Sequence, residues 1–266
     1  MDDHEYLFVI SINIKQLEMY VKKSFEKLLT HKLEKQQLTM NSKNPKDLVP
    51  TFFTDTANSY DKIVYWTTFG EDNAWKNKIL KQLSSEKTVL DLACGTGILT
   101  KLIADKIPQS TIIGLDITKN YIEKAKEKLK SYKNISFVNQ DAEKLNLGRK
   151  FDCITASYLP KYCISDVLVK NCIEHLNIGG KIILHDFTYP KNKFVRKMWN
   201  FYFDILYLVG FFVPDWKKVF VSLPNLIRTT DWVAEYEKAM EKNGLTVYKQ
   251  DLTLGTSAII VGTKII

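Results

Sequence analysis

The sequence predicts a single α/β domain with a doubly wound, mostly parallel sheet of seven strands. Two observations carry this prediction: short apolar runs alternate with helical segments, and a glycine turn directly follows the first buried run. Alternation of this kind is typical of strands joined by crossover helices, which place helices on both faces of a parallel sheet. The chain is also large enough for one such core, because 45% of its 266 residues are apolar.

The first five strands are expected between residues 88 and 184, where apolar and β-branched residues form short runs. Two helical segments, at about 47–58 and 72–83, precede them. The expected order is then strand 88–92, helix 98–106, strand 111–115, helix 121–130, strand 135–139, strand 151–156, helix 164–176 and strand 181–184. A parallel sheet binds its ligand at the carboxyl ends of the central strands, so a site is expected there.

The pattern changes after the fifth strand. Residues 190–228 form a long aromatic and largely apolar stretch, which we expect to be a helical insertion that covers the site as a lid. A last helix at about 230–243 ends at an Asn-Gly pair, which favours a helix C-terminus. Strands 245–251 and 257–264 close the domain, and we expect one strand near this end to run antiparallel to the others.

Residues 1–46 differ in character from the domain expected at 47–266. Apolar residues between Leu17 and Leu29 fall at helical spacing among many lysines, so this extension should form a basic amphipathic helix. Such a helix suits a membrane or a partner, but a helix folded back on its own domain or a mobile tail would have the same pattern. The polar stretch before residue 47 is typical of a linker, and Met40 offers an alternative start.

Charge and cysteine content limit the partners and the compartment. The net charge of +8 and the pI of about 9.1 favour an anionic partner, either nucleic acid or a membrane surface, without choosing between them. The four cysteines form no CxxC pair and no zinc-finger spacing, so we expect reduced thiols and no metal site. The acidic start and the lack of an apolar run of about 20 residues predict a cytoplasmic protein with no signal peptide and no membrane span.

A glycine turn between Val89 and Thr100 is the main chemical motif. Gly95 and Gly97 let the backbone approach a ligand closely, and the helix that follows offers unpaired N–H groups. A dinucleotide site usually has a third glycine, but that position is Thr100. Asp91, four residues before the first glycine, would repel a pyrophosphate and suits a cofactor with an amine and a sulfonium. The turn therefore favours S-adenosylmethionine as the cofactor.

Polar residues at the ends of the next strands agree with this cofactor. Asp116, 21 residues after Gly95, can accept hydrogen bonds from both ribose hydroxyls. Asp141 can accept from the adenine amino group, and the backbone N–H of Ala142 can reach a ring nitrogen. Ser157 ends the fourth strand, near the expected place of the methionine part. Each motif is weak by itself, but all four in register favour this cofactor strongly.

These motifs resemble the class I methyltransferases, and in particular the ubiquinone/menaquinone biosynthesis C-methyltransferase family. The resemblance covers about residues 50–264 and rests on an opening pattern, a fourth-strand signature, a fifth-strand end and a closing hairpin. The matching residues are Phe53, Tyr60-Asp61, Phe69-Gly70, Trp75-Lys76, Phe151–Ser157, Asp186–Pro190, Leu252–Gly255 and Gly262–Lys264. The resemblance implies a Rossmann-like methyltransferase fold and cofactor contacts at Thr96, Asp116, Asp141, Ala142 and Ser157.

The resemblance also implies that the substrate is a prenylated quinol, such as a demethylmenaquinol. The sequence departs from the family pattern after the fourth strand, where Pro160-Lys161-Tyr162 stands in place of an Arg-Asn pair. Lys161 keeps the positive charge but lacks the planar fork of arginine. Ile63-Val64 stands in place of a Met-Asn pair, and Asp141 in place of an asparagine found in many relatives. These departures concern the substrate and base arrangement more than the cofactor site.

Methylation of a quinol carbon needs a group that removes the phenol proton or stabilises the phenolate. The candidates are Tyr60, Asp61, Lys161, His185 and Asp186. His185 lies at the end of the fifth strand, and an ordinary histidine titrates near neutral pH, so it is an attractive base. Each candidate also has a purely structural interpretation, as a packing residue or a surface charge.

The insertion at 190–228 should decide the substrate class. Its apolar interior and basic edges suit a lipophilic substrate drawn from an anionic membrane surface, although a buried helix or a homodimer face would have the same composition. Its aromatic residues do not alternate with basic ones, which disfavours nucleic acid. The sequence thus predicts an S-adenosylmethionine-dependent methyltransferase of a prenylated quinol. The alternatives are methylation of another lipid or small molecule, methylation of RNA, and cofactor binding without catalysis.

Overall fold

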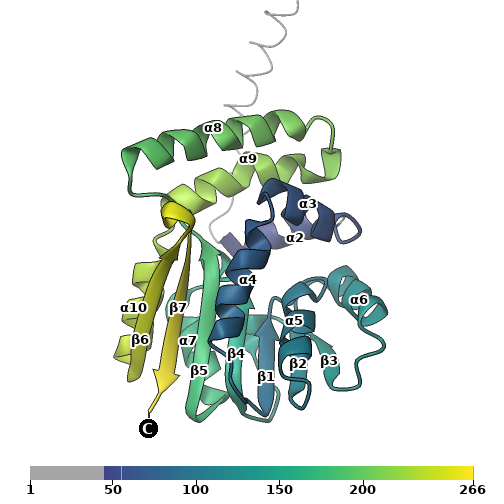
Figure 1. Ribbon diagram of the computed structural model, residues 1–266, viewed down its shortest axis with the longest axis vertical. Helices are drawn as coiled ribbons and strands as arrows, with labels where there is room; N and C mark the ends of the chain where they lie inside the picture. The colour runs from purple at the N-terminus through teal and green to yellow at the C-terminus, as the bar shows by residue number, and fades with distance from the viewer. Residues whose placement is uncertain (1–44, 55, 266) are drawn as a thin grey trace, which may run out of the picture. The chain divides into compact units, whose positions relative to one another are not determined.

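The computed structural model describes residues 45–54 and 56–265, so the expected helix within residues 1–46 lies almost wholly outside the described residues. The described chain contains a seven-stranded sheet in the order β3-β2-β1-β4-β5-β7-β6 (Figure 1). The strands are β1 (Thr88–Leu92), β2 (Thr111–Asp116), β3 (Ile135–Asn139), β4 (Phe151–Ser157), β5 (Leu176–Phe187), β6 (Leu245–Leu252) and β7 (Ser257–Lys264). This arrangement confirms the predicted doubly wound sheet.

The strand register places a ligand crevice beside β1. This strand pairs in parallel with β2 on one side and with β4 on the other, so the strand order reverses between β1 and β4. Ligands of doubly wound sheets bind at such a reversal, outside the carboxyl ends of the strands. β7 is antiparallel to both β5 and β6, as expected, because the short turn Thr253–Gly255 can only join β6 and β7 as a hairpin.

Within the described residues, nine α-helices and four short 3-10 turns accompany the sheet, and they lie in three places: ahead of it in the chain, on its faces and across its end. The first two places hold α2 (Leu48–Phe53), α3 (Tyr60–Thr67), α4 (Glu71–Lys81), α5 (Ile98–Lys106), α6 (Lys119–Lys128), α7 (Ser165–Glu174) and α10 (Trp232–Lys242). The third place, across the end of the sheet, holds α8 (Lys193–Val209) and α9 (Pro214–Thr229). Three of the short turns lie at Pro45–Asp47, Ala142–Lys144 and Pro160–Tyr162.

One helix was not expected from the sequence. The segment predicted as a single helix at about 47–58 ends at Phe53, and a separate helix, α3, begins at Tyr60. The intervening residues are rich in Thr, Asn and Ser, whose side chains hydrogen-bond to nearby backbone and favour turns over helix interiors. This break lets α3 run in a different direction from α2 and lie beside the strand ends (Figure 1).

The core consists of two layers against the sheet and a third under the lid. On one face α7 and α10 bury Leu168 and Tyr236 against the strands, and on the other α4 and α5 bury Ile79 and Ile103. The third cluster joins α2 to α8 and α9 around large aromatic side chains, among them Trp199. Figure 1 shows α8 and α9 stacked across the carboxyl ends of the strands, so the predicted helical lid is present. No helix within the described residues is long and apolar enough to cross a membrane.

Candidate active site

The glycine turn after β1 has a left-handed backbone at three positions. Ala93, Gly95 and Gly97 all have positive φ angles, of 50°, 55° and 82°. Gly97 has the largest of these φ angles, in a region that side chains with a Cβ atom rarely adopt, so this position favours glycine for its conformation. The turn directs the start of α5 toward the crevice beside β1.

Asp116 at the end of β2 holds this turn in place. One oxygen of its carboxylate accepts from the backbone N–H of Gly95 at 2.9 Å, and the other accepts from the N–H of Thr118 at 2.8 Å. Burial raises the pKa of Asp116, and the two backbone donors oppose that rise. The residue expected to bind ribose therefore also fixes the loop beside it.

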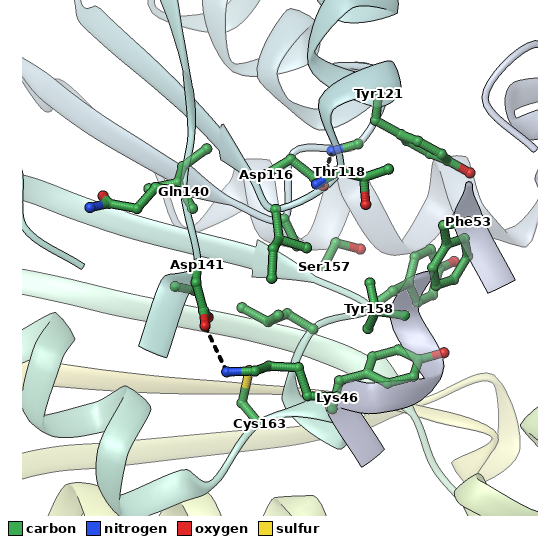
Figure 2. A pocket seen from close by; sticks show the side chains of 18 of the residues that line it. Lys46, Phe53, Asp116, Thr118, Tyr121, Gln140, Asp141, Ser157, Tyr158 and Cys163 are labelled. Carbon is green, nitrogen blue, oxygen red and sulfur yellow. Dashed lines mark hydrogen bonds and ion pairs between the residues drawn. The ribbon is translucent and has the colours of Figure 1, made fainter. Parts of the chain in front are cut away.

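A narrow cavity, which we call the cofactor cavity, lies between the turn and the ends of β2, β3 and β4 (Figure 2). Five of the predicted cofactor residues line it: Gly95, Asp116, Asp141, Ala142 and Ser157. The rest of its wall includes Phe53, Tyr121 and Gln140, which the sequence did not identify as cofactor contacts. The structure thus brings residues from four separate strand ends to one place.

The other three predicted cofactor residues lie behind the cavity wall. Asp91 is fully buried, and its carboxylate accepts from the hydroxyls of Thr100 at 2.6 Å and Thr155 at 2.9 Å. Burial raises the pKa of Asp91 to about 6. The hydroxyl of Thr96 donates to Asp61 at 2.5 Å, and Gly97 is the N-cap residue of α5. These residues shape the turn, and direct cofactor contact by them stays a prediction.

Lys46 is a wall residue that sequence patterns did not reveal. Its Nζ lies 2.7 Å from Oδ2 of Asp141 (Figure 2). The same Nζ lies 2.5 Å from Oε2 of Glu143. Burial opposes its charge, but the hydrogen bonds to these two carboxylates prevail and raise the pKa of Lys46. The carboxylate expected to meet adenine is therefore already ion-paired. The polar, linker-like residues around Lys46 gave no signal for this contact.

A second cavity, which we call the lid cavity, lies between the strand ends and α8 and α9. It has a volume of about 490 Å³ and a mostly apolar, aromatic lining. Residues that line both cavities are Phe53, Tyr60, Tyr158 and Tyr162. Tyr60 packs edge-on against Tyr121 with ring centres 5.3 Å apart, and burial raises its pKa well above the ordinary value, so it stays protonated. The two cavities thus meet at a shared aromatic wall.

Lys161 carries a positive charge at the base of the lid cavity. Its side chain is buried, and its Nζ lies 2.5 Å from Oδ1 of Asp186. The same Nζ lies 4.6 Å from the ring centre of Tyr162 and 5.6 Å from that of Phe187, within the range of cation–π attraction. Burial lowers the pKa of Lys161 and raises that of Asp186, while their pairing favours the charged form of each.

Of the four predicted catalytic residues, Tyr60 and Lys161 line the lid cavity, and Asp61 and His185 do not. The ring nitrogens of His185 bond to the hydroxyls of Ser157 at 2.9 Å and Ser257 at 2.8 Å, and burial lowers its pKa well below the ordinary value. Asp61 forms an ion pair with Lys128 at 2.7 Å on the outer side of the turn. A direct role for either residue in proton transfer stays a prediction.

A buried polar cluster beneath the aromatic wall was also missed. The hydroxyl of Tyr158 donates to Oδ1 of Asp72 at 2.7 Å, and Asp72 pairs with Lys76 one turn along α4. The Tyr158 ring stacks on Phe187 with centres 4.9 Å apart, and its backbone has a φ of 68°. The i,i+4 spacing of Asp72 and Lys76 was a readable signal, since Lys76 already belonged to the opening pattern.

Comparisons with known proteins agree with this geometry. The demethylmenaquinone methyltransferase of Lactobacillus johnsonii is 28% identical over 241 residues, which are 86% of this chain and 97% of that protein. The demethylmenaquinone methyltransferase of Staphylococcus aureus is 24% identical over 84% of this chain and 96% of its own length. The structure of an O-methyltransferase family protein from Burkholderia thailandensis matches with a TM-score of 0.56 and 16% identity, over 80% of this chain and 61% of that chain, which supports the fold.

A family model matches residues 39–264, nearly the whole of the domain. The match includes the glycine turn, the strand ends that line the cofactor cavity and the lid. The chain therefore belongs to the ubiE/COQ5 methyltransferase family and is a methyltransferase that uses S-adenosylmethionine.

Proposed function

We propose that this methyltransferase transfers the methyl group to a ring carbon of a prenylated quinol, such as a demethylmenaquinol. The observation that carries the proposal is the junction of the two cavities, where a large apolar space meets the cofactor cavity at an aromatic wall with a buried cation. The relatives from Lactobacillus johnsonii and Staphylococcus aureus are demethylmenaquinone methyltransferases, which supports the same substrate class.

The residues of the cofactor cavity fit S-adenosylmethionine, which supplies an electrophilic methyl group when bound. Asp116 is the acceptor for the ribose hydroxyls, and Asp141 with the N–H of Ala142 recognises adenine. Ser157 lies on the side where the methionine part belongs, and His185 holds the Ser157 hydroxyl in position. Asp91 acts indirectly in this scheme, because its two hydroxyl partners tie β1 to β4 and to α5 beneath the turn.

The lid cavity suits a substrate with a polar ring and a long apolar tail. The quinol ring belongs at the aromatic wall, where Tyr60 and Tyr162 face both cavities. The tail then lies among Trp199, Phe203 and Phe220 of α8 and α9, where burial contributes about 25 cal/mol per Å² of apolar surface. Holding ring and methyl group together in a fixed orientation supplies a large part of the rate enhancement.

Lys161 is the residue that activates the ring in this proposal. A quinol carbon becomes nucleophilic when the neighbouring hydroxyl loses its proton, and the Lys161 cation stabilises the resulting phenolate in a site of low polarity. Asp186 keeps Lys161 charged and oriented, while Tyr60 stays protonated and is able to donate a hydrogen bond. Solvent water accepts the hydroxyl proton. The ring carbon would then take the methyl group as the bond between that group and the cofactor sulfur breaks, which leaves the sulfur as a neutral thioether. The ring carbon finally loses its own proton to water, which restores the aromatic ring.

The residues after β4 favour a second candidate substrate class as well. Lys161 and Tyr162 occupy the place where the family resemblance has Arg and Asn, so the group that meets the substrate hydroxyl has a different shape. Another lipid or small molecule with an acidic ring hydroxyl would also fit a single cation beside an apolar cavity. We include contact with a membrane surface in the proposal, because such substrates partition into lipid.

The test uses purified protein, methyl-labelled S-adenosylmethionine and a chemically reduced lipid extract from membranes that lack the methylated quinone. Mass spectrometry follows the label, which we expect on a quinone ring. The Asp116→Ala variant should lose the activity, whereas Asp105→Ala, at an exposed aspartate on α5, should keep it. Label on a different lipid would retain the methyltransferase and reject the quinol, and label on added RNA would reject a lipid substrate altogether.

A further inference from the structure

The lid helix α8 is apolar on its outer side as well as on its inner side. Its inner side chains, such as Trp199 and Phe203, are buried against α9 and the lid cavity. Its outer side carries apolar residues spaced four, three, four and three positions apart, which places them in one line along the helix. This outer stripe consists of Phe194, Met198, Phe201, Ile205 and Leu208, and the loop residue Phe212 continues it.

The outer stripe is exposed to an unusual degree for side chains of this size. Phe194 is 71% exposed, Phe201 65% and Phe212 87%. Single exposed apolar residues are common, but a continuous apolar line of this length marks a surface that binds something. Figure 1 shows α8 outside α9, on the side away from the sheet. The exposed fractions place the outer stripe on the surface of this helix.

The mouth of the lid cavity opens onto the same surface. Four apolar residues both line the cavity and are strongly exposed, so they form its rim: Phe69, Phe194, Met198 and Leu254. Two of them, Phe194 and Met198, are also members of the outer stripe. Phe69 reaches this edge from the turn after α3, where its ring lies 5.9 Å from that of Tyr202 on α8. Stripe and rim therefore form one continuous apolar face.

Basic residues border this face. Residues 191–218 contain six Lys or Arg and two Asp. Lys193 and Lys197 are exposed and flank the stripe on one side of α8 near its start, and the exposed Asp204 lies on the same side about two turns later, given 3.6 residues per helical turn. At the other end Lys217 lies over the Phe211 ring at 5.2 Å, beside the exposed Lys218. An apolar line with a basic border matches the acyl chains and the negative headgroups of an anionic membrane.

We propose that the outer stripe and the rim dock on an anionic membrane surface, so that the lid cavity opens directly into the acyl chains. The proposal rests on the proposed function for the lipophilic tail. A protein partner or a second copy of the chain seated on this face would cover the rim and block the cavity. A membrane covers the apolar stripe and leaves the mouth open to the phase in which the tail dissolves. The geometry favours the membrane for this reason.

Vesicle binding by the full-length chain tests the docking face directly. The double variant Phe201→Glu with Leu208→Glu changes the stripe but not the cavity lining. We expect it to bind vesicles that contain phosphatidylglycerol at least tenfold more weakly than the unchanged chain. The matched control Ile178→Glu, at a 73% exposed residue at the amino end of β5, should bind as the unchanged chain does. Lys197→Gln should weaken binding roughly fivefold, and only to anionic vesicles.

Turnover separates docking from chemistry. The double variant should fail to methylate a long-tailed quinol in vesicles, yet methylate a short-tailed quinol in solution within about twofold of the unchanged chain, because its aromatic wall is intact. If the unchanged chain methylates neither quinol, the proposed function fails while the vesicle result still stands by itself. Equal vesicle binding by the double variant and the unchanged chain would overturn the docking face. A dimer in sedimentation velocity that the double variant dissociates would assign the face to a second copy instead.

Discussion

The two cavities of this methyltransferase are built in different ways. The cofactor cavity is formed by backbone turns at strand ends, and single hydrogen bonds fix it, such as those from Gly95 and Thr118 to Asp116. The lid cavity is formed by side chains of two packed helices, with many aromatic residues that share the same role. The first therefore depends on the identity of a few residues, and the second depends on total apolar volume and on one buried charge.

This difference predicts how each region tolerates change. A substitution in the cofactor cavity removes a bond that no neighbour can replace, whereas an apolar substitution in the lid cavity is compensated by repacking. Lys161 is the exception on the lid side, because it is a buried cation among apolar side chains. Variants that compare these cases test whether the contrast holds.

The largest effect is expected at Lys161. Lys161→Met keeps an unbranched side chain, one atom shorter, but removes the charge, so kcat should fall roughly 100- to 1000-fold because the phenolate of the proposed mechanism loses its stabilising cation. Cofactor affinity, measured by calorimetry with S-adenosylhomocysteine, should change less than about twofold, since Lys161 does not line the cofactor cavity.

Lys161→Arg provides the control, because it restores the charge and should recover part of kcat. The Met variant also leaves Asp186 as a buried carboxylate without its partner, so thermal unfolding must be followed in parallel. Normal kcat in a folded Lys161→Met protein would remove Lys161 from the chemistry. The lid cavity would then act on its substrate through apolar contacts alone.

The next effect concerns Asp116. Asp116→Ala should weaken cofactor binding roughly 100-fold, because it removes the proposed ribose acceptor and the partner of two backbone N–H groups. The comparison is Phe203→Leu on the lid side, which should raise KM for the quinol only a few-fold. Equal losses in the two variants would contradict the contrast between the regions.

The sequence predicted the cofactor cavity better than the lid cavity, because local turns form the first and the packing of helices forms the second. Strand ends such as Leu92 and Asn139 are fixed by short apolar runs and turns, which are local signals, and the glycine turn has a local motif. The contact of Lys46 with Asp141 joins residues 95 positions apart, and the Tyr158–Asp72 bond joins residues 86 apart. Such contacts depend on how α2 and α4 dock on the sheet, which no local pattern specifies.

The catalytic candidates show the same limit. Composition and strand position identified His185, but they could not show that its two ring nitrogens are both occupied by serine hydroxyls. Lys161 had an equally plain surface interpretation in the sequence, and its burial became visible only with the lid in place. Sequence position located the crevice, and packing decided which side chains face it.

A smaller effect is expected from the pH dependence of stability at Asp91. Burial raises the pKa of its carboxyl to about 6, against 3.8 for an ordinary aspartate. The folded chain therefore binds more protons than the unfolded chain between these values, and this contribution to stability is lost as the pH rises through about 6. Relative to Asp91→Asn, the unchanged chain should gain roughly 1 kcal/mol of unfolding free energy at pH 5 compared with pH 8.

Urea unfolding of both proteins at the two pH values measures this difference. Thr155→Val provides a second test, because it removes a hydroxyl that donates to Asp91 and should raise the pKa of the carboxyl further. The loss of unfolding free energy should then occur at higher pH. The opposite slope, with the unchanged chain gaining at pH 8, would mean that Asp91 is stabilised as a carboxylate in the folded chain.

The smallest effect is expected at Lys46. This residue lies ahead of α2 and contacts Asp141, which follows β3, in the wall of the cofactor cavity. Both oxygens of Asp141 are engaged, one by Lys46 and the other by the backbone N–H of Glu143. An adenine amino group that uses Asp141 must therefore compete with Lys46. Lys46→Met should raise the affinity for S-adenosylhomocysteine a few-fold at low salt, and the gain should shrink as salt screens the ion pair.

Lys124→Met, which removes an exposed lysine that pairs with Glu127 on α6, provides the matched control and should leave affinity unchanged. A loss of affinity in Lys46→Met would show instead that Lys46 supports the bound cofactor, by packing its stem on adenine or by orienting Asp141. The segment before α2 would then contribute a residue that binds the cofactor, in addition to the residues at the strand ends. Both cavities would then depend in part on the docking of helical segments, and the difference between them would be smaller than proposed.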